Sequence, residues 1–337
     1  MPVYEPVESP DETTVFPYHD LTAPTTADVY RARKRIEASL PRTPLVRSEP
    51  FSAAFDADVY LKREDTLPTG AFKVRGGMNL VSGIDESFAD PGLIAASTGN
   101  HGQSVAYAGR EFGVPTTIVV PEDANPSKVT AMERLGADVR QHGDEFDEAR
   151  KLAESLAIEE GYRYVHSANE PDLIAGVATA GLEVVEDLPE IDYLFCPVGG
   201  GSSASGYSLT VGRLTDATVV GAQSEAAPAM YRAWEEGSLE PHDRMETFAE
   251  GISTRAPFAL TTEILREHLD EFRLVSDAAL REGIRDFFAE ETIVAEGASA
   301  ASLAAMRGMA DELTGRTVVL PISGRNMDPE RLLSILK

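Results

Sequence analysis

Lys73 stands in a segment suited to a reactive amine. It lies between Phe72 and Val74, directly after the turn signal Pro68-Thr69-Gly70 and at the expected start of a helix. A lysine held among apolar groups loses solvation of its ammonium form, so its pKa falls and the amine becomes nucleophilic. Such an amine can form an imine with an aldehyde. The alternative is a surface lysine whose alkyl chain covers an apolar patch, and only features elsewhere in the chain favour the reactive amine.

A glycine-rich segment follows a fully apolar run. The run 193–198 is expected to be a strand, and it leads into the sequence Gly199, Gly200, Gly201, Ser202 and Ser203 before a predicted helix. Glycines let the backbone approach an anion closely, while successive N–H groups and two hydroxyls supply donors. The segment is therefore typical of a phosphate cradle, although it matches neither the Walker A motif nor the dinucleotide fingerprint. Tight packing of a helix on a sheet is the alternative explanation.

A second polar segment also joins a predicted strand to a predicted helix. It contains backbone donors, hydroxyls and an amide, which suit the binding of a carboxylate, and it consists of Ser97, Thr98, Gly99, Asn100 and His101. The same residues could serve only as a helix cap with turn glycines. No second histidine lies at metal-ligand spacing from His101, so no metal site is assigned. A third polar segment, 323–326, follows the last predicted strand.

Alternating elements place these segments at strand ends. From residue 92 onward, short apolar strands alternate with helices, which predicts βαβ units and buried parallel sheets. The predicted strands are 59–62, 93–96, 116–121, 137–140, 162–165, 193–198, 218–222, 273–275 and 317–321. The predicted helices are 26–40, 76–81, 102–112, 127–135, 144–160, 173–187, 203–214, 277–290 and 297–311. Residues 1–24 are expected to form an extended arm, and 236–260 an irregular acidic segment. Two α/β blocks should leave a cleft at the carboxyl ends of their strands.

The composition limits the class of protein. A length of 337 residues exceeds that of a usual single core, so two domains are predicted. The net charge of −26 argues against nucleic acid as a partner, and no apolar run reaches the roughly 20 residues that span a bilayer. Residues 1–20 lack the apolar core of a signal peptide, so a cytoplasmic protein is expected. Cys196 is the only cysteine, which excludes an intramolecular disulfide. Only six of the 30 basic residues are lysines, and this acidic, lysine-poor composition predicts a halophilic protein, with an ordinary acidic enzyme as the alternative.

Taken together, four segments resemble those of one enzyme family. They are the stretch 62–76 around Lys73, Gly99-Asn100-His101-Gly102-Gln103, Val198-Gly199-Gly200-Gly201, and Ser323-Gly324-Arg325-Asn326. Their sequence and order resemble the pyridoxal-phosphate (PLP) enzymes of the tryptophan-synthase-β fold (fold type II), most nearly the serine/threonine dehydratase branch. The resemblance implies an α/β fold of two domains, each a parallel-sheet-based, open twisted α/β sandwich. It implies a large PLP-binding domain of residues 1–90 plus 171–337 and a small α/β domain of residues 91–170.

The resemblance also implies roles for the matching residues. Lys73, next to Phe72 in the cofactor site, looks like the catalytic lysine that carries PLP and later removes the substrate α-proton. The cofactor phosphate would be held by Gly199, Gly200, Gly201, Ser202 and Ser203. Asn100 would bind the ring hydroxyl and Ser323 the pyridine nitrogen, as acceptor or donor. The substrate carboxylate would be bound by Ser97, Thr98, Gly99, Asn100 and His101. A neutral serine at the ring nitrogen cannot keep the ring protonated, which favours loss of a β-hydroxyl over racemisation or transamination.

Some positions depart from the family pattern. Ser202 replaces the fourth glycine of the phosphate loop, but a serine still donates. Arg325 replaces a glycine and is a candidate second carboxylate clamp for an acidic substrate; alternatively it points to solvent. Thr98 stands where serine racemases have a second catalytic serine, so racemisation is not expected. Gln223 and Glu225 only partly match a region that holds a divalent cation in some members, so no metal is expected.

The activity implied by the resemblance is that of a PLP-dependent ammonia-lyase. It would convert threonine or serine to a 2-oxo acid and ammonia by α,β-elimination. The alternatives are a 3-hydroxyaspartate dehydratase, a β- or γ-replacement enzyme of the cysteine synthase or threonine synthase type, and an amino-acid-sensing PLP protein. Val74 after Lys73 favours the dehydratases over the replacement enzymes. A small amino acid is the expected partner, with no nucleic acid or membrane, and a homodimer or homotetramer is expected.

Overall fold

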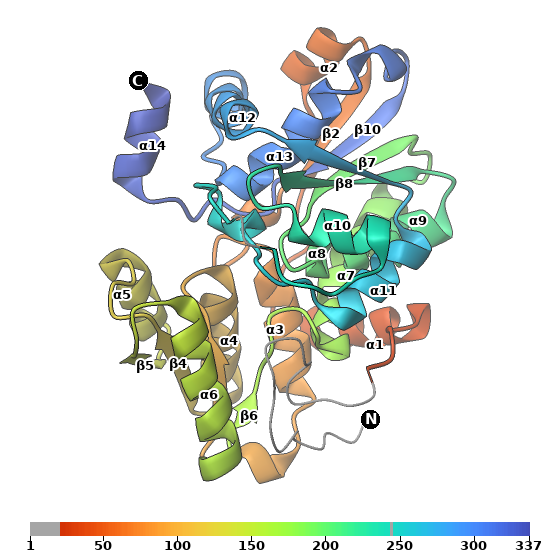
Figure 1. The fold of residues 1–337 in the computed structure, drawn as a ribbon. Helices are drawn as coiled ribbons and strands as arrows, with labels where there is room; N and C mark the ends of the chain where they lie inside the picture. The colour runs from red at the N-terminus through yellow and green to blue at the C-terminus, as the bar shows by residue number, and fades with distance from the viewer. Residues whose placement is uncertain (1–20, 243–244) are drawn as a thin grey trace.

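Two β-sheets form the centre of the protein. The structure is a computed structural model that describes residues 21–242 and 245–337, so most of the predicted arm 1–24 lies outside the described residues. One sheet has six strands and the other has four. Figure 1 shows the larger sheet in the upper part of the molecule and the smaller sheet at the lower left, each flanked by helices. The predicted α/β fold class is confirmed.

The larger sheet has the order β1-β2-β10-β7-β8-β9. Its strands are β1 (Leu45–Arg47), β2 (Asp58–Lys62), β7 (Tyr193–Pro197), β8 (Thr218–Ser224), β9 (Glu271–Val275) and β10 (Thr317–Pro321). All neighbouring strands are parallel except β1, which runs antiparallel to β2 at the edge. The strand β1 was not predicted, and it adds an antiparallel edge to a sheet that is otherwise parallel.

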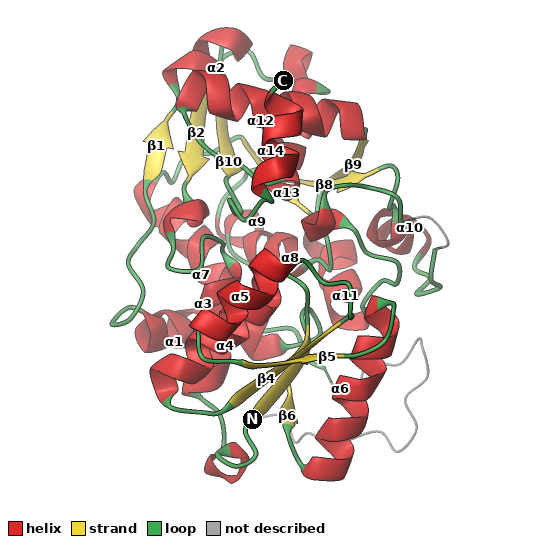
Figure 2. Cartoon of the chain, turned by 90° about the vertical axis from the view of Figure 1, so that its left-hand side faces the viewer, coloured by secondary structure: helices red, strands yellow, loops and turns green. Residues whose placement is uncertain are grey.

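The smaller sheet is wholly parallel, with the order β5-β4-β3-β6. Its strands are β3 (Leu93–Ala96), β4 (Thr116–Val120), β5 (Asp138–Gln141) and β6 (Arg163–Tyr164). Figure 2 shows α4 (Asn100–Phe112) and α6 (Phe146–Glu160) on opposite sides of this sheet. Ile118 packs with α4, whereas the next residue, Val119, packs with α6. Burial of both faces explains why the central strands β3 and β4 are buried along their whole length, whereas the edge strand β5 is polar and partly exposed.

Helices also cover both faces of the larger sheet. The helices that complete the described chain are α1 (Thr26–Ile36), α2 (Glu49–Phe55), α3 (Lys73–Ser82), α5 (Pro126–Arg134), α7 (Pro171–Asp187), α8 (Ser202–Ser208), α9 (Val211–Leu214), α10 (Ala229–Glu236), α11 (Ala259–His268), α12 (Asp277–Glu291), α13 (Gly297–Arg307) and α14 (Pro329–Leu336). Phe195 and Val220 belong to the core formed with α12 and α13. Their neighbours Leu194 and Val219 belong to the core formed with α7, α8 and α11.

Several helices differ from the prediction. The first helix was expected to reach Leu40, but it ends at Ile36. The helix expected over 203–214 is two helices, α8 and α9, with a break at Leu209 and Thr210. The helices α2, α10, α11 and α14 were not predicted, because they are short and lie in polar or proline-containing sequence. Of these, α11 begins inside the stretch that was expected to be irregular.

The two domain ranges remain a prediction. Strands of the smaller sheet occupy residues 93–164, and those of the larger sheet lie before residue 63 and after residue 192. The helix α3 packs against both α4 and α7 and so connects the regions of the two sheets. Among the described helices, none combines the length and the apolar character required to cross a membrane.

Candidate active site

A cavity of about 840 Å³ lies where strands of the two sheets end. Its walls include residues that directly follow β3, β7 and β10, at the carboxyl ends where open α/β sheets bind ligands. The cavity wall contains every residue that the sequence assigned to the site: Phe72, Lys73, Ser97, Thr98, Gly99, Asn100, His101, Gly199, Gly200, Gly201, Ser202, Ser203 and Ser323. Segments far apart in the sequence thus meet at one place, and their individual roles remain predictions.

The amine of Lys73 lies in this cavity, and no carboxylate of residues 21–242 or 245–337 pairs with it. Its Nζ donates to the Ser167 carbonyl oxygen at 2.8 Å and to Ser202 Oγ at 2.9 Å. Burial lowers the pKa of Lys73 to about 8. Part of the amine is therefore unprotonated near neutral pH, and an unprotonated amine is the nucleophilic form.

Hydrogen bonds connect the backbone around Lys73 to the regions of both sheets. The N–H of Phe72 donates to the carbonyl oxygen of Ser323, which follows β10, at 2.9 Å. The carbonyl oxygen of Lys73 accepts from Ser104 Oγ, on α4, at 2.6 Å. These two bonds hold the first turn of α3 at the junction of the sheets, so the position of the amine is fixed by the fold.

The glycine segment forms a tight turn from β7 into α8. Gly201 has φ +90°, a left-handed conformation that favours glycine. A Cβ on Gly199 would lie 2.1 Å from the carbonyl oxygen of Gly251, so this position also requires glycine. Close packing therefore explains part of the motif, as the alternative interpretation held. The turn nevertheless places the hydroxyls of Ser202 and Ser203 in the cavity wall, where they can serve as donors.

The side chain of Ser97 is compatible with both roles suggested for its segment, which are helix capping and carboxylate binding. Its Oγ accepts hydrogen bonds from the N–H groups of Gly99 at 3.2 Å and Gly102 at 2.9 Å, which secures the start of α4. An oxygen that accepts two bonds still has its hydroxyl hydrogen to donate. Capping by Ser97 is therefore compatible with the predicted binding of a carboxylate.

The side-chain amide of Asn100 is held at both ends. Its Nδ2 donates to the two carboxylate oxygens of Glu296 at 3.0 and 3.1 Å. Its Oδ1 accepts from Asn326 Nδ2 at 2.7 Å, and the same nitrogen donates to the carbonyl oxygen of Thr69 at 2.7 Å. One hydrogen of Nδ2 can be shared between the two oxygens of the Glu296 carboxylate, so the second hydrogen of Nδ2 can serve the predicted contact with the cofactor ring hydroxyl.

Glu296 is a buried carboxyl that sequence reasoning missed. It is 8 % exposed, lines the cavity and has no cation within ion-pairing distance among the described residues. Burial raises the pKa of Glu296 to about 7. In the sequence, an acidic residue before an alanine-rich helix is typical of a surface N-cap. Here its side chain makes no capping bond to α13 and turns into the cavity instead.

The two histidines of the cavity are neutral. Burial, together with the charge of Lys73, lowers the pKa of His101 to about 3, and its Nε2 lies 2.9 Å from the carbonyl oxygen of Val165. Sequence reasoning missed His166, whose Nδ1 accepts from the N–H groups of Ala168 and Asn169 at 3.0 and 2.9 Å. Burial lowers the pKa of His166 to about 3 as well. Neither histidine supplies positive charge to the predicted carboxylate site.

Ser323 lies against a buried hydroxyl that was also missed. Ser323 is 1 % exposed, and its Oγ lies 3.0 Å from that of Ser299 on α13. Ser299 in turn donates to the carbonyl oxygen of Gly324 at 2.9 Å and accepts from the N–H of Gly324 at 3.0 Å. The hydroxyl predicted to meet the ring nitrogen is thus held in a fixed position.

The structure gives no support to Arg325 as a carboxylate clamp. Its backbone N–H donates to the carbonyl oxygen of Gly70 at 2.9 Å, and its side chain is exposed and outside the cavity wall. Gln223 is buried, and its Oε1 accepts from the N–H of Tyr231 at 3.0 Å. The described part of the chain holds no group of three or more His, Cys, Asp or Glu side chains that could bind a metal.

The donor set fits PLP. The cofactor needs an amine for its aldehyde, donors for its phosphate, and polar partners for its ring hydroxyl and ring nitrogen. In the cavity, Lys73 Nζ lies 2.9 Å from the hydroxyl of Ser202, at the predicted phosphate loop, and Asn100 and Ser323 line the same space. The residues that would hold PLP are therefore Lys73, the segment 199–203, Asn100 and Ser323.

Comparison with known proteins supports the same family. A family model for "Pyridoxal-phosphate dependent enzyme" matches residues 36–324. An L-threonine ammonia-lyase of Thermotoga maritima is 37% identical over 90% of this chain and 76% of its own length. An L-threo-3-hydroxyaspartate ammonia-lyase of Pseudomonas sp is 35% identical over 92% of this chain and 98% of its own length. A crystal structure of a T.th. threonine deaminase has a TM-score of 0.85 and 34% identity, and the match covers 90% of this chain and 99% of that one. The chain therefore belongs to the pyridoxal-phosphate-dependent enzymes of fold type II.

Proposed function

We propose that the protein is a PLP-dependent ammonia-lyase that converts threonine or serine to a 2-oxo acid and ammonia. The observation that carries this proposal is the amine of Lys73, which lies in a cavity with a lowered pKa and no carboxylate partner. The relatives named for threonine ammonia-lyase activity support the same reaction. Bound PLP supplies an electron sink for the charge that forms at the substrate α-carbon.

Lys73 is the base in this proposal. Its amine takes the substrate α-proton, the bond from the β-carbon to its hydroxyl oxygen breaks, and the hydroxyl leaves with a proton as water. Hydrolysis of the unsaturated amine that is left gives the 2-oxo acid and ammonia. The Ser167 carbonyl oxygen and Ser202 Oγ hold Nζ by hydrogen bonds at 2.8 and 2.9 Å, so the base stays beside the reacting carbon.

The substrate carboxylate lies, in this proposal, at the segment 97–101. Ser97 has a hydroxyl hydrogen to donate, and Thr98, Gly99 and Asn100 line the cavity beside it. The segment carries no net charge, because His101 is neutral. Recognition therefore rests on hydrogen-bond donors at the start of α4 and not on an ion pair.

The charges of the cavity wall favour a substrate with an uncharged side chain. Apart from Lys73, each lining cation already faces a carboxylate: Lys128 and Arg331 face Glu250, Arg150 faces Glu154 and Asp147, and Arg255 faces Asp147. A second acidic group on the substrate would have to compete with these pairs. The 3-hydroxyaspartate dehydratase reaction is the second candidate, because a relative named for it matches nearly the full length of both chains.

Release of 2-oxo acid and ammonia from three amino acids tests the proposal. PLP-loaded protein is given threonine, serine or 3-hydroxyaspartate without a second nucleophile, and a Lys73→Ala protein is the control. Turnover of threonine or serine supports the proposal, and faster turnover of 3-hydroxyaspartate supports the second candidate. Turnover only with an added thiol nucleophile would indicate a replacement enzyme, and bound PLP without any turnover would indicate a sensing protein.

The same assay, run at low and at molar salt, tests the proposed adaptation to high salt. A net charge of −26 repels itself, and salt screens this repulsion. The proposal predicts higher activity and stability at molar salt. We also propose a cytoplasmic homodimer or homotetramer that acts on a small amino acid, and light scattering of the purified protein would determine the oligomeric state.

A further inference from the structure

The direction of each hydrogen bond at Asn100 is fixed by groups that can act in only one way. The main-chain carbonyl of Thr69 has no hydrogen and can only accept. Asn326 Nδ2 donates to the carbonyl oxygen of Thr69, so this nitrogen, and not the amide oxygen, faces Asn100. Asn100 must then present Oδ1 to Asn326 and Nδ2 to Glu296.

The three side chains therefore form one chain of hydrogen bonds in which every donor faces the same direction, here called a single polarity. It runs from the Thr69 carbonyl through Asn326 and Asn100 to Glu296, and its bonds measure 2.7, 2.7 and 3.0 Å. The backbone N–H of Asn326 also donates to Glu296, so Glu296 contacts both asparagines. A side-chain amide without such partners could rotate by half a turn and exchange its donor for its acceptor.

The chain of bonds is built from parts that the fold holds rigidly. Thr69 is 5 % exposed, and Glu296 is 8 % exposed. The N–H of Glu296 donates to the carbonyl oxygen of Gly324 at 3.0 Å, and Gly324 pairs with Ala71.

We propose that Glu296 and Asn326 are positioning residues that present Asn100 to the cavity as a hydrogen-bond donor. The inference rests on the proposed function, because the group that receives this bond is the ring hydroxyl oxygen of PLP. A donor facing this oxygen stabilises its ionised form, whereas an acceptor would favour the neutral hydroxyl. Glu296 and Asn326 thus determine the ionisation of the ring that Lys73 carries, through the orientation of Asn100.

The test reverses the polarity of the chain of bonds. Asn326→Asp places an acceptor opposite Asn100 Oδ1, and Glu296→Gln supplies an amide that can donate to Asn100. Asn326→Asp alone breaks the single polarity, whereas Glu296→Gln alone can keep it, because its amide oxygen still accepts from Asn100 Nδ2. The double variant Glu296→Gln/Asn326→Asp can restore both bonds at Asn100, but only with the amide of Asn100 turned around; the bond to the Thr69 carbonyl is lost in both proteins that carry the Asn326→Asp change.

Two readouts are measured on purified protein titrated with PLP: the dissociation constant, and the absorbance ratio of the ionised and neutral ring forms. Asn326→Asp should weaken PLP binding by about five- to a hundredfold, because it leaves a buried amide oxygen facing a carboxylate. The double variant should regain part of the thermal stability lost in Asn326→Asp, yet hold PLP with a larger neutral fraction than the wild type. Glu186→Gln removes a charge of the same kind at a surface pair outside the cavity wall and should leave both readouts unchanged.

A purely structural role predicts a different result. In that case the double variant would regain both stability and the wild-type absorbance ratio, which would overturn the proposal. Equal PLP affinity and spectra in the wild type and all variants would also overturn it, while leaving the proposed function intact. Failure of the wild type to bind PLP at all would overturn the proposed function and this inference together.

Discussion

Lys62 and Lys73 are two lysines of one sequence motif, one buried and one partly buried, and among the described residues only Lys62 has a carboxylate partner. Lys62 is fully buried at the end of β2, and its Nζ donates to Glu183 at 2.6 Å and to the carbonyl oxygen of Thr43 at 2.8 Å. Burial lowers the pKa of Lys62, but the carboxylates of Glu64 and Glu183 oppose this effect. For Lys73, burial lowers the pKa and no carboxylate opposes it.

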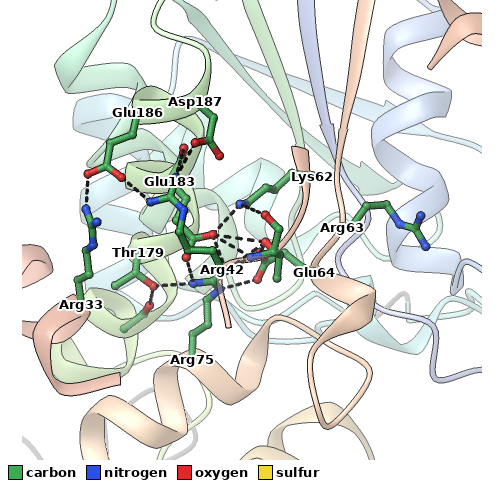
Figure 3. Close-up of polar contacts among 12 residues, drawn as sticks. Arg33, Arg42, Lys62, Arg63, Glu64, Arg75, Thr179, Glu183, Glu186 and Asp187 are labelled. Atoms are coloured by element: carbon green, nitrogen blue, oxygen red, sulfur yellow. Dashed lines mark hydrogen bonds and ion pairs between the residues drawn. The ribbon is translucent and has the colours of Figure 1, made fainter. Parts of the chain in front are cut away.

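The cluster around Lys62 pairs each of its charges (Figure 3). Arg75 donates to Glu64 at 2.7 Å and to Glu183 at 2.8 Å, all in the interior. Burial alone would raise the pKa of Glu183, but the hydrogen bonds and charges of Arg75 and Lys62 lower it to about 2. Two cations and two carboxylates balance one another, so this cluster holds α3, α7 and β2 together and has no reactive group.

The cavity, in contrast, contains two ionisable groups that are not paired in this way. Lys73 and Glu296 both lie there without an ion pair, and burial moves both pKa values toward neutrality, to about 8 and about 7. A buried charge without a partner is costly, and such groups concentrate at functional sites. The comparison teaches that burial alone does not make a lysine reactive; burial without a carboxylate does.

The largest expected effect is on activity. Lys73→Ala removes the amine that carries PLP and takes the α-proton, so turnover of threonine or serine should fall by about 10³-fold or more. Release of 2-oxo acid, followed by absorbance, measures the change. Lys128→Ala removes the other lysine of the cavity wall and serves as the matched control. Comparable losses in both variants would contradict the distinction between Lys73 and the other lysines.

The next effect is on stability. Glu183→Ala leaves Lys62 and Arg75 to share Glu64, and breaking a buried ionic group in this way should cost about 3–5 kcal/mol in the free energy of unfolding. Glu186→Ala changes the same residue type on the same helix at a surface pair with Arg33 and Arg42, and should cost at most about 1 kcal/mol. Urea denaturation of both variants measures the difference. Equal losses of unfolding free energy in the two variants would show that the buried cluster contributes no more to stability than the surface pair does.

The smallest effect is a pH dependence of stability. The pKa of Glu296 is raised by burial to about 7 from its usual 4.5, so the folded protein binds more protons than the unfolded chain between these values. Stability contributed by this group is present below pH 4.5 and is lost as the pH rises through 7. Glu296→Gln should therefore flatten the fall in stability between pH 5 and 8 by about 1–3 kcal/mol.

Denaturation of cofactor-free protein at several pH values measures how the free energy of unfolding changes with pH. The comparison of interest is the difference between wild type and variant at each pH, because other groups titrate equally in both. Parallel curves for the two proteins would contradict a raised pKa at Glu296. A larger fall in the variant would mean that the carboxylate is stabilised by a cation near the cavity.

Local patterns were enough to predict most of the alternating elements, whereas the prediction of a reactive Lys73 needed four separate segments taken together. The apolar run before Gly199 and the turn before Lys73 each predict where a strand or helix meets the cavity, because ligands bind at strand ends in such folds. The contacts that orient these groups could not be predicted. Ser167 lies 94 residues from Lys73 and Glu296 lies 196 residues from Asn100, so the pairing depends on packing that no local pattern records.

Reduction of the PLP-loaded protein with borohydride tests the central claim most directly. The sequence contains only six lysines, at positions 34, 62, 73, 128, 151 and 337, so peptide mapping can assign the reduced linkage without ambiguity. The account predicts that the label is found on Lys73 alone and is lost in Lys73→Ala. A label on Lys62 or Lys128, or no label in protein saturated with PLP, would contradict it.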